Sequence, residues 1–375
     1  MIHTIKYLSV FLFLLFVSCE SHEKEIAEKK EKIEKELTDV TGIVQGNSKA
    51  KYVGKAGELI VVADNTVFTE EIGELLDSTF GDYIRPFYPP QKMFEIRFLD
   101  IHSFKNTSLR IRNVLQLELT DKVERPQLTV KKDYYANGQL YSVAKAKTMD
   151  ELVDLLILET PRLVKLYDKQ EWLREYHRHK KANNKVLKSK VKKQFGITLE
   201  LPRTGRYESV QNNYAHILFP DRSRQMDLQT RAESAYSTSK ANFIQSGIML
   251  WQIPFKDSSQ LDPAYLMKVR DTILKYNALH EYPGVYMGTQ DHPAVIPVHK
   301  RIKVGTIEGY EFRGLYKFTG KLEPSGGMFW SFHFLHPERN KIVAVSAYLD
   351  TPPTMNPALD LRKLQAILYS VRLEG

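Results

Sequence analysis

The sequence predicts an α+β fold with two mixed α/β halves, whose sheets are mainly antiparallel and which are joined by a long basic helix. Segments in which apolar and polar residues alternate, a pattern typical of strands, recur in both parts of the chain. Amphipathic segments lie between them, and a strongly basic segment, Trp172–Lys193, separates the two groups of strands. A signal peptide and a charged helical tether precede the two halves.

The first residues have the pattern of a lipoprotein signal peptide, predicted here over residues 1–18. Lys6 supplies a positive charge, Leu8–Val17 is apolar, and Ser18 places a small residue just before Cys19. The apolar run is far shorter than the roughly 20 residues that cross a bilayer. We therefore expect acyl chains on Cys19 to attach the mature chain to a membrane.

Cys19 is the single cysteine of the 375 residues. If acylation consumes it, the mature chain has no thiol. Disulfides, cysteine-ligated metals and cysteine nucleophiles are then excluded together, so packing alone must stabilise the fold.

The segment that follows the lipidated cysteine, residues 19–51, is predicted to be a charged tether. Its acids precede lysines by four residues, as in Glu20 with Lys24 and Glu25 with Lys29, which supports a solvated helix. The stretch Gly42–Lys51 then has the polar, glycine-containing composition of a linker.

Composition and charge limit the classes of partner. With 42% hydrophobic residues the chain can bury a large core, and its length suggests two domains. The formal charge is +9, but Trp172–Lys193 carries nine basic residues against Glu175 alone, so the rest of the mature chain is nearly neutral. One basic helix on a neutral body is not the distributed footprint of a nucleic-acid-binding protein, and no nucleic-acid partner is expected.

The N-terminal α+β half is predicted over residues 52–147. It opens with a continuous apolar run that suits a buried strand, continues with an amphipathic helix, and then returns to alternating segments. The predicted elements are a strand at Glu58–Val62, a helix at Phe68–Phe80, strands at Phe94–Phe98 and Val114–Leu119, and a turn at Asn137-Gly138.

Residues 148–195 are predicted to be two connecting helices. The first covers Met149–Leu158, and Thr160-Pro161 restarts the chain as a capping residue followed by a proline at the first helical position. The second helix is expected to continue to about Phe195, where Gly196 has the place of a C-terminal cap.

The C-terminal α+β half is predicted over residues 196–375. Its pattern is mostly that of strands, with one helix capped by Asp262-Pro263 and a final amphipathic helix. The predicted strands are Ile197–Pro202, Ile248–Phe255, His299–Phe318, Phe329–Leu335 and Lys341–Leu349, and the helices run from Asp262 to about Leu279 and from Leu359 to Val371. The order of strand, helix, hairpin and helix resembles the small PsbP and Mog1 type of α+β domain.

A polar cluster is the best candidate for a buried network or a ligand groove. It combines Arg270 and Asp271 on the helix with Glu311 and Arg313 on a strand. Alternation places Glu311 and Arg313 on one strand face, opposite the aromatic residues around them. We expect Arg270 or Asp271 to form a salt bridge with Glu311 or Arg313, since charges at this junction can be buried only in pairs.

A basic stripe is the second candidate. It is expected to be exposed and to contact acidic headgroups or an acidic partner, although a merely solvated helix face explains the same pattern. Its members are Arg174, Arg178, Lys181, Lys185, Lys188 and Lys192.

No catalytic signature accompanies these candidates. The sequence has no glycine-rich phosphate loop, no Gly-x-Ser-x-Gly elbow and no zinc-protease helix. His177 and His179 point about 200° apart on a regular helix and cannot share a metal ion. We therefore predict no catalytic residue, no metal site and no cofactor.

Several segments carry a resemblance to a known family. They are Lys55–Val62, Tyr135–Gln139, Phe195–Ile197, Arg270-Asp271, Tyr286-Met287, Glu311–Leu315 and Gly326–Phe329. Together they resemble an uncharacterised group of envelope lipoproteins, the domain-of-unknown-function 4837 family of the Bacteroidetes. The resemblance covers the chain from about residue 52 and implies a lipid-anchored envelope protein of a Gram-negative bacterium, without a known activity.

Two functions follow as hypotheses. The first is a non-catalytic outer-membrane lipoprotein that binds an envelope protein, a glycan or another ligand, facing either side of that membrane. Glu20, where an inner-membrane retention signal would usually place aspartate, favours the outer membrane by resemblance to Gram-negative sorting. The alternative is a hydrolase of envelope glycan or peptide, in which Asp271 and Glu311 would face each other at roughly 5 to 10 Å.

Overall fold

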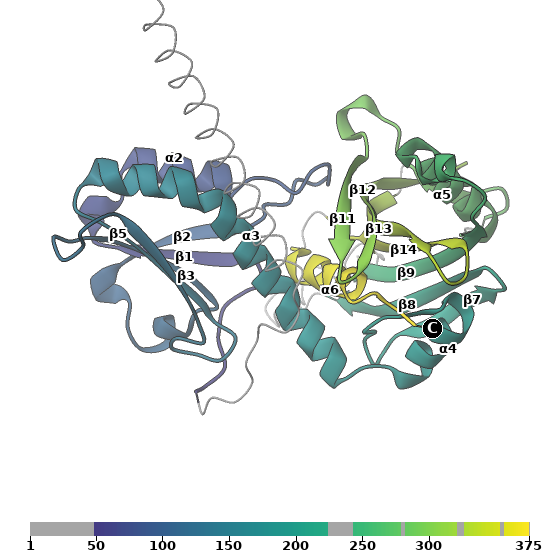
Figure 1. The fold of residues 1–375 in the computed structure, drawn as a ribbon, viewed down its shortest axis with the longest axis horizontal. Coiled ribbons are helices and arrows are strands. Elements are labelled where there is room, and N and C mark those ends of the chain that lie inside the picture. The colour runs from purple at the N-terminus through teal and green to yellow at the C-terminus, as the bar shows by residue number, and fades with distance from the viewer. Residues whose placement is uncertain (1–48, 224–242, 279–281, 321–325, 353–355, 375) are drawn as a thin grey trace, which may run out of the picture. The chain divides into compact units, whose positions relative to one another are not determined.

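The computed structural model describes residues 49–223, 243–278, 282–320, 326–352 and 356–374 (Figure 1). The predicted signal peptide, Cys19 and nearly all of the predicted tether lie outside the described residues. Gln45–Gly375 forms one compact unit. Two large sheets with helices packed on them confirm the α+β class.

The N-terminal sheet has five strands in the order β2-β1-β3-β5-β4. Strand β1 pairs in parallel with β2 and β3, and β3 pairs in parallel with β5, whereas β4 and β5 are antiparallel. Its pairing is thus mainly parallel, unlike that of the C-terminal sheet. The fully buried run of β1 suits a central parallel strand. The strands are β1 (Glu58–Ala63), β2 (Glu95–Asp100), β3 (Asn113–Leu119), β4 (Gln127–Lys132) and β5 (Leu140–Ala146).

Helices cover one face of this sheet. Leu59 and Val61 point toward α2 (Glu70–Thr79) and α3 (Met149–Lys181), which lie over the same face in Figure 1. Ile60 and Val62 point to the opposite face, where they pack with Phe104. The short 3₁₀ helices of this part are η1 (Asn65–Val67), η2 (Ile101–Ser103) and η3 (Asn106–Arg110).

The predicted break at Thr160-Pro161 is wrong, because α3 runs without interruption from Met149 to Lys181. Pro161 cannot donate to the carbonyl of Ile157, but Ile157 is 56% exposed and water can bond that carbonyl instead. Helix α3 ends at Lys181 instead. The Asn184 side chain then accepts a hydrogen bond from the Leu187 amide and caps the next helix, α4 (Lys185–Phe195).

The C-terminal sheet is antiparallel throughout its described pairings, with β10-β12-β13-β14-β9-β8-β7 in order and β11 beside β12. The strand predicted over His299–Phe318 is a hairpin that turns at Gly305, where φ is +62°. The strands are β7 (Arg206–Gln211), β8 (Tyr214–Ser223), β9 (Phe243–Pro254), β10 (Tyr286–Thr289), β11 (Val298–Val304), β12 (Ile307–Thr319), β13 (Gly326–His336) and β14 (Lys341–Asp350).

The strand predicted at Ile197–Pro202 is shorter than expected. Strand pairing is confined to β6 (Ile197–Thr198), whose partner is β15 (Arg372–Leu373), and Pro202 forms an isolated bridge with Asn183. Two 3₁₀ helices, η6 (Ser258–Leu261) and η7 (Pro293–Val295), complete the elements of this part.

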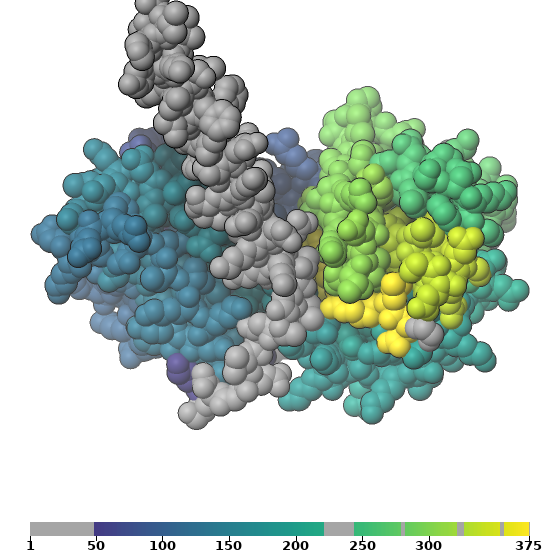
Figure 2. Space-filling view, in the orientation of Figure 1, coloured from purple at the N-terminus to yellow at the C-terminus, as the bar shows by residue number. Residues whose placement is uncertain are grey.

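Helices cover both faces of the C-terminal sheet. Leu266 and Leu274 of α5 (Pro263–Asn277) pack with Phe312 and Phe329 on one face. On the other face, α6 (Ala358–Tyr369) and α4 pack with Trp330, Phe332 and Phe334. In Figure 2 the yellow C-terminal residues lie between teal and green ones, so segments far apart in sequence form one surface.

Helix α3 contacts both sheets' cores and fixes them together. The Tyr167 hydroxyl donates to the Val114 carbonyl at 2.5 Å, on the N-terminal side. Asp168 accepts from Gln365 of α6 at 3.0 Å and also pairs with Arg362. From the loop before β2, Phe87 reaches the C-terminal core and packs edge-on against Trp330.

A fully buried carboxylate lies at the centre of this arrangement. Glu171 of α3 accepts from Arg112 at 2.8 Å, from Arg174 at 2.7 Å and from the Asn113 side chain at 2.6 Å. Burial alone would raise the pKa of Glu171, but Arg174 and Arg112 hold it below its ordinary value. Both guanidinium groups also lie about 5 Å from the centre of the Tyr52 ring.

Replacing Glu171 with glutamine should destabilise the protein by about 3 to 5 kcal/mol, because it leaves two buried arginines without an anion. Urea unfolding at pH 7 measures this difference. Since the folded-state pKa of Glu171 is lowered, its contribution is present above the unfolded pKa of about 4.3 and is lost as the pH falls further.

The matched control is Glu308→Gln. Glu308 forms an exposed ion pair with Arg301, at 2.9 Å, and its loss should cost at most about 1 kcal/mol. Equal unfolding free energies for the two variants would contradict the central role of Glu171.

Candidate functional site

The predicted polar cluster is divided into two sites. Arg270 is 1% exposed, and its guanidinium lies 3.7 Å from the centre of the Phe329 ring. It donates to the Thr289 hydroxyl at 2.7 Å and contacts Asp271 at 3.3 Å. Asp271 in turn accepts from the Thr289 amide and hydroxyl, so these three residues tie α5 to β10.

Glu311 belongs to the other face of the sheet. Its carboxylate is buried and accepts from the Tyr369 hydroxyl of α6 at 2.5 Å. Lys300 and Arg313 lie 3.3 Å and 3.5 Å away, and the Arg313 guanidinium also lies over the Trp330 ring. Burial, followed by the nearby Glu311 charge, raises the pKa of Tyr369 well above its ordinary value, so its hydroxyl remains a donor.

The predicted salt bridge between the helix and strand charges is therefore wrong. Alternation correctly separated Glu311 and Arg313 from Phe312, but α5 packs on the aromatic face rather than the charged one. Asp271 and Glu311 lie on opposite faces of the sheet. They cannot act together as the paired carboxylates of a hydrolase.

The predicted basic stripe is not one exposed surface. Arg174 is buried beside Glu171, because its planar group fills the N-terminal network. Because α3 ends at Lys181, Lys185, Lys188 and Lys192 lie on α4 instead of α3. Lys188 pairs with Glu200 at 2.7 Å, Lys192 pairs with Glu374 at 2.8 Å, and Arg178 pairs with Glu175 at 3.2 Å.

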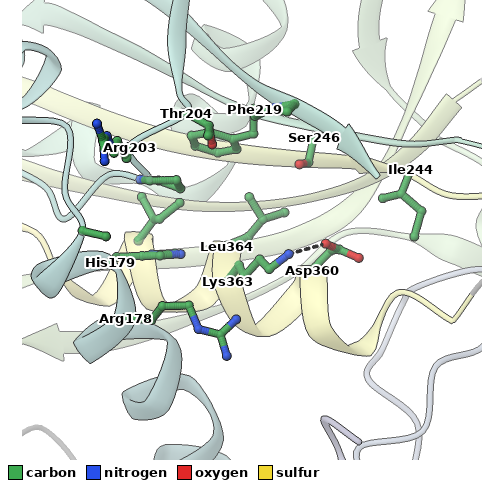
Figure 3. Close-up of a pocket in the computed structure, with 14 residues that line it drawn as sticks. Arg178, His179, Arg203, Thr204, Phe219, Ile244, Ser246, Asp360, Lys363 and Leu364 are labelled. Atoms are coloured by element: carbon green, nitrogen blue, oxygen red, sulfur yellow. Dashed lines mark hydrogen bonds and ion pairs between the residues drawn. The ribbon is translucent and has the colours of Figure 1, made fainter. Parts of the chain in front are cut away.

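A pocket that the sequence did not predict lies where α3 ends (Figure 3). It encloses about 420 Å³, within the range of about 300 to 1,000 Å³ that is common for small-ligand sites. Its walls come from the end of α3, residues 202–204, the adjacent ends of β8 and β9, and α6. The apolar part is formed by Ala182, Pro202, Phe219, Pro220, Ile244, Leu364 and Ile367.

The charged residues of the pocket are mostly cations. Arg178, Arg203 and Lys363 line it, and Asp360 is its one acidic lining residue, bound to Lys363 at 3.0 Å. In Figure 3, Arg178 and Lys363 lie on one side of the space and Phe219 on the opposite side. Arg203 lies on the Phe219 side, next to Thr204, so the cations flank the apolar lining from both sides.

His179 lines the pocket and is almost fully buried. The residue is 5% exposed, and its Nδ1 atom is buried without a hydrogen-bond partner among the described residues. Burial, together with the nearby Lys363 and Arg178 charges, lowers the pKa of His179 to about 4. The imidazole is therefore neutral at pH 7, and either ring nitrogen can serve as donor or acceptor.

Glu175 lies one turn earlier on α3 and is 1% exposed. Neither of its carboxylate oxygens has a hydrogen bond among the described residues, although Arg178 is within ion-pair distance. Burial raises the pKa of Glu175 above its ordinary value. The Arg178 charge, followed by those of Lys363 and Arg112, opposes this rise.

Within the described ranges, no group of three or more histidine, aspartate or glutamate side chains is placed to hold a metal ion. No helix in the same residues is both long enough and apolar enough to span a membrane. The pocket could not be predicted from the sequence, because its walls come from segments that are far apart in the chain.

Tyr369→Phe should destabilise the protein by about 1 to 3 kcal/mol, because it leaves the buried Glu311 carboxylate without its shortest hydrogen bond. Thermal or urea unfolding measures the effect. Tyr276→Phe is the control, since Tyr276 is 68% exposed and should change stability by less than about 0.5 kcal/mol. A Tyr369→Phe variant as stable as this control would show that the Glu311 contact contributes nothing.

Comparison with known proteins gives two family matches. The model described as "Domain of unknown function (DUF8532)" matches residues 53–180, and the one described as "Domain of unknown function (DUF4837)" matches residues 183–370. Among curated proteins, none matches this sequence.

Two solved structures show a weak likeness. The Ran-binding protein Mog1p of Saccharomyces cerevisiae is 13% identical, with a TM-score of 0.29, and a mutant of the protein Mog1 is 14% identical, with a TM-score of 0.28. Each match covers 48% of this chain and 90% of the other. The DUF4837 match spans half of the 375 residues. The chain therefore belongs to the DUF4837 family.

Proposed function

We propose that this protein is a non-catalytic, lipid-anchored binding protein of the cell envelope, whose ligand occupies the pocket between α3 and α6. The observation that carries the proposal is a pocket of about 420 Å³ that combines an apolar lining with three cationic side chains, Arg178, Arg203 and Lys363. A concave, mostly apolar site with a few placed polar groups is the usual form of a small-ligand site.

The titratable groups of the pocket favour binding over catalysis. A general acid and base need two titratable groups that converge on one reacting atom. In the pocket, Asp360 is bound to Lys363, and the buried Glu175 is held by Arg178. The hydrolase alternative rested on Asp271 and Glu311 facing each other, and the two carboxylates lie on opposite faces of the sheet.

The anchor is the second part of the proposal and rests on the sequence around Cys19. Two or more acyl chains would hold the protein stably on a membrane, with the outer membrane favoured by Glu20. Binding at a membrane also fits a pocket with an apolar wall, since the molecules concentrated there carry apolar groups.

Cys19→Ala should move the full-length protein from the membrane pellet to the soluble fraction, because it removes the acylated side chain. Cell fractionation followed by immunoblotting measures the distribution. Ser18→Thr is the control: it keeps the cysteine and a small preceding residue, so that protein should remain in the pellet. Unchanged pelleting of Cys19→Ala would eliminate the lipid anchor.

The pocket is tested with an uncharged fluorescent probe, N-phenyl-1-naphthylamine, which should gain fluorescence on entering the apolar site. Thr204→Trp places a large ring in the pocket and should lower probe affinity at least about tenfold, or about 1.4 kcal/mol. Thr129→Trp, on exposed β4 and remote from the pocket lining, should leave it unchanged.

Thermal melts must show both tryptophan variants folded. Equal probe binding by the wild-type protein and the folded Thr204→Trp variant would show that the pocket is not the binding site.

A further inference from the structure

We propose that the ligand of this pocket is an anion joined to an apolar group, a carboxylate or phosphate on an alkyl chain, held by Arg203 with Arg178 and Lys363. The inference rests on the proposed function, because it names the class of ligand for the same site. It is argued from charge complementarity, from the position of the cations and from the apolar lining of the pocket.

The lining has an excess of positive charge. Arg178, Arg203 and Lys363 contribute three cations and Asp360 one anion, and His179 is neutral, so the balance is 3 − 1 = +2. Two cations are partly compensated, since Lys363 pairs with Asp360 and Arg178 with Glu175. Arg203 has no ion pair among the described residues, and its side chain is exposed at the pocket.

The backbone holds Arg203 in place although its side chain is unpaired. The Asn184 side chain donates to the Arg203 carbonyl at 3.1 Å and to the Gly205 carbonyl at 3.0 Å. The Gly205 amide closes the turn by donating to the Pro202 carbonyl at 3.0 Å. Because the turn is already ordered, binding an anion at Arg203 adds no cost of ordering the backbone, and only the side chain loses freedom.

The apolar wall requires the rest of the ligand to be hydrophobic. Phe219, Leu364 and Ile367 line it and belong to the core on this face of the sheet. Thr204 and Ser246 add only two hydroxyl groups, too few for a sugar ring with many hydroxyls to exchange its bonds with water. An alkyl chain meets no unpaired polar group along this wall.

His179 is consistent with the same ligand. Its ring lines the pocket, and an anion bound between Lys363 and Arg178 would offset the positive field that now disfavours its protonation. The site therefore has cations beside an apolar surface.

The test compares three ten-carbon ligands, decanoate, decyl phosphate and decan-1-ol, as competitors of the neutral probe at pH 7. The two anions should bind at least about tenfold more tightly than the alcohol, and the ratio should fall as the salt concentration rises. A larger preference for decyl phosphate identifies a phosphate, such as a lipid headgroup, and a preference for decanoate identifies a fatty acid.

Arg203→Gln is the informative variant, because it removes a cation without leaving a buried acid unpaired. It should weaken both anions about threefold to tenfold and leave decan-1-ol unchanged. Lys268→Gln, which removes an exposed charge from α5 outside the pocket, should alter none of the three affinities.

Equal affinities for the alcohol and the anions, or an Arg203→Gln variant that binds all three ligands normally, would overturn the ligand class. If Thr204→Trp nevertheless weakens binding of the neutral probe, the proposed function stands and only the anion inference fails. If Thr204→Trp leaves the neutral probe bound, the site itself is wrong.

Discussion

The buried Glu171 carboxylate is the contact on which the arrangement of this protein depends. It binds Arg112 and Asn113 at the start of β3 and Arg174 on its own helix, so two segments converge on one charge. A carboxylate so deeply buried is tolerated only when its partners are fixed in position. This requirement orients α3, and α3 carries Asp168 to α6 and His179 to the pocket.

Local sequence signals predicted most elements because their causes are local. The Asp262 side chain caps α5 and Pro263 fits its first turn, as their residue types required. Thr160-Pro161 misled because a single proline can be tolerated where water replaces the lost donor. Asn184 was the true start of a helix, and its signal as a capping residue was present in the sequence.

The candidate sites were less predictable because they depend on which helix covers which face. Strand alternation assigned Glu311 and Phe312 to opposite faces correctly, but no periodicity says whether α5 or α6 will pack on a given one. Arg174 looked like a surface charge and is buried, since only the fold brings Glu171 and the β3 residues to it. The pocket could not be predicted for the same reason. Its two helices, α3 and α6, are far apart in the sequence, with most strands of the C-terminal sheet between them.

The reach of Phe87 into the opposite core gives the boundary between the two family matches a particular meaning. The matches divide the chain between residues 180 and 183, yet Phe87 and Ile84 pack with Trp330 and the α6 leucines far beyond that point. A fragment cut at the boundary would expose this aromatic contact to water and to other chains. The two regions therefore match separate family models but share one hydrophobic core.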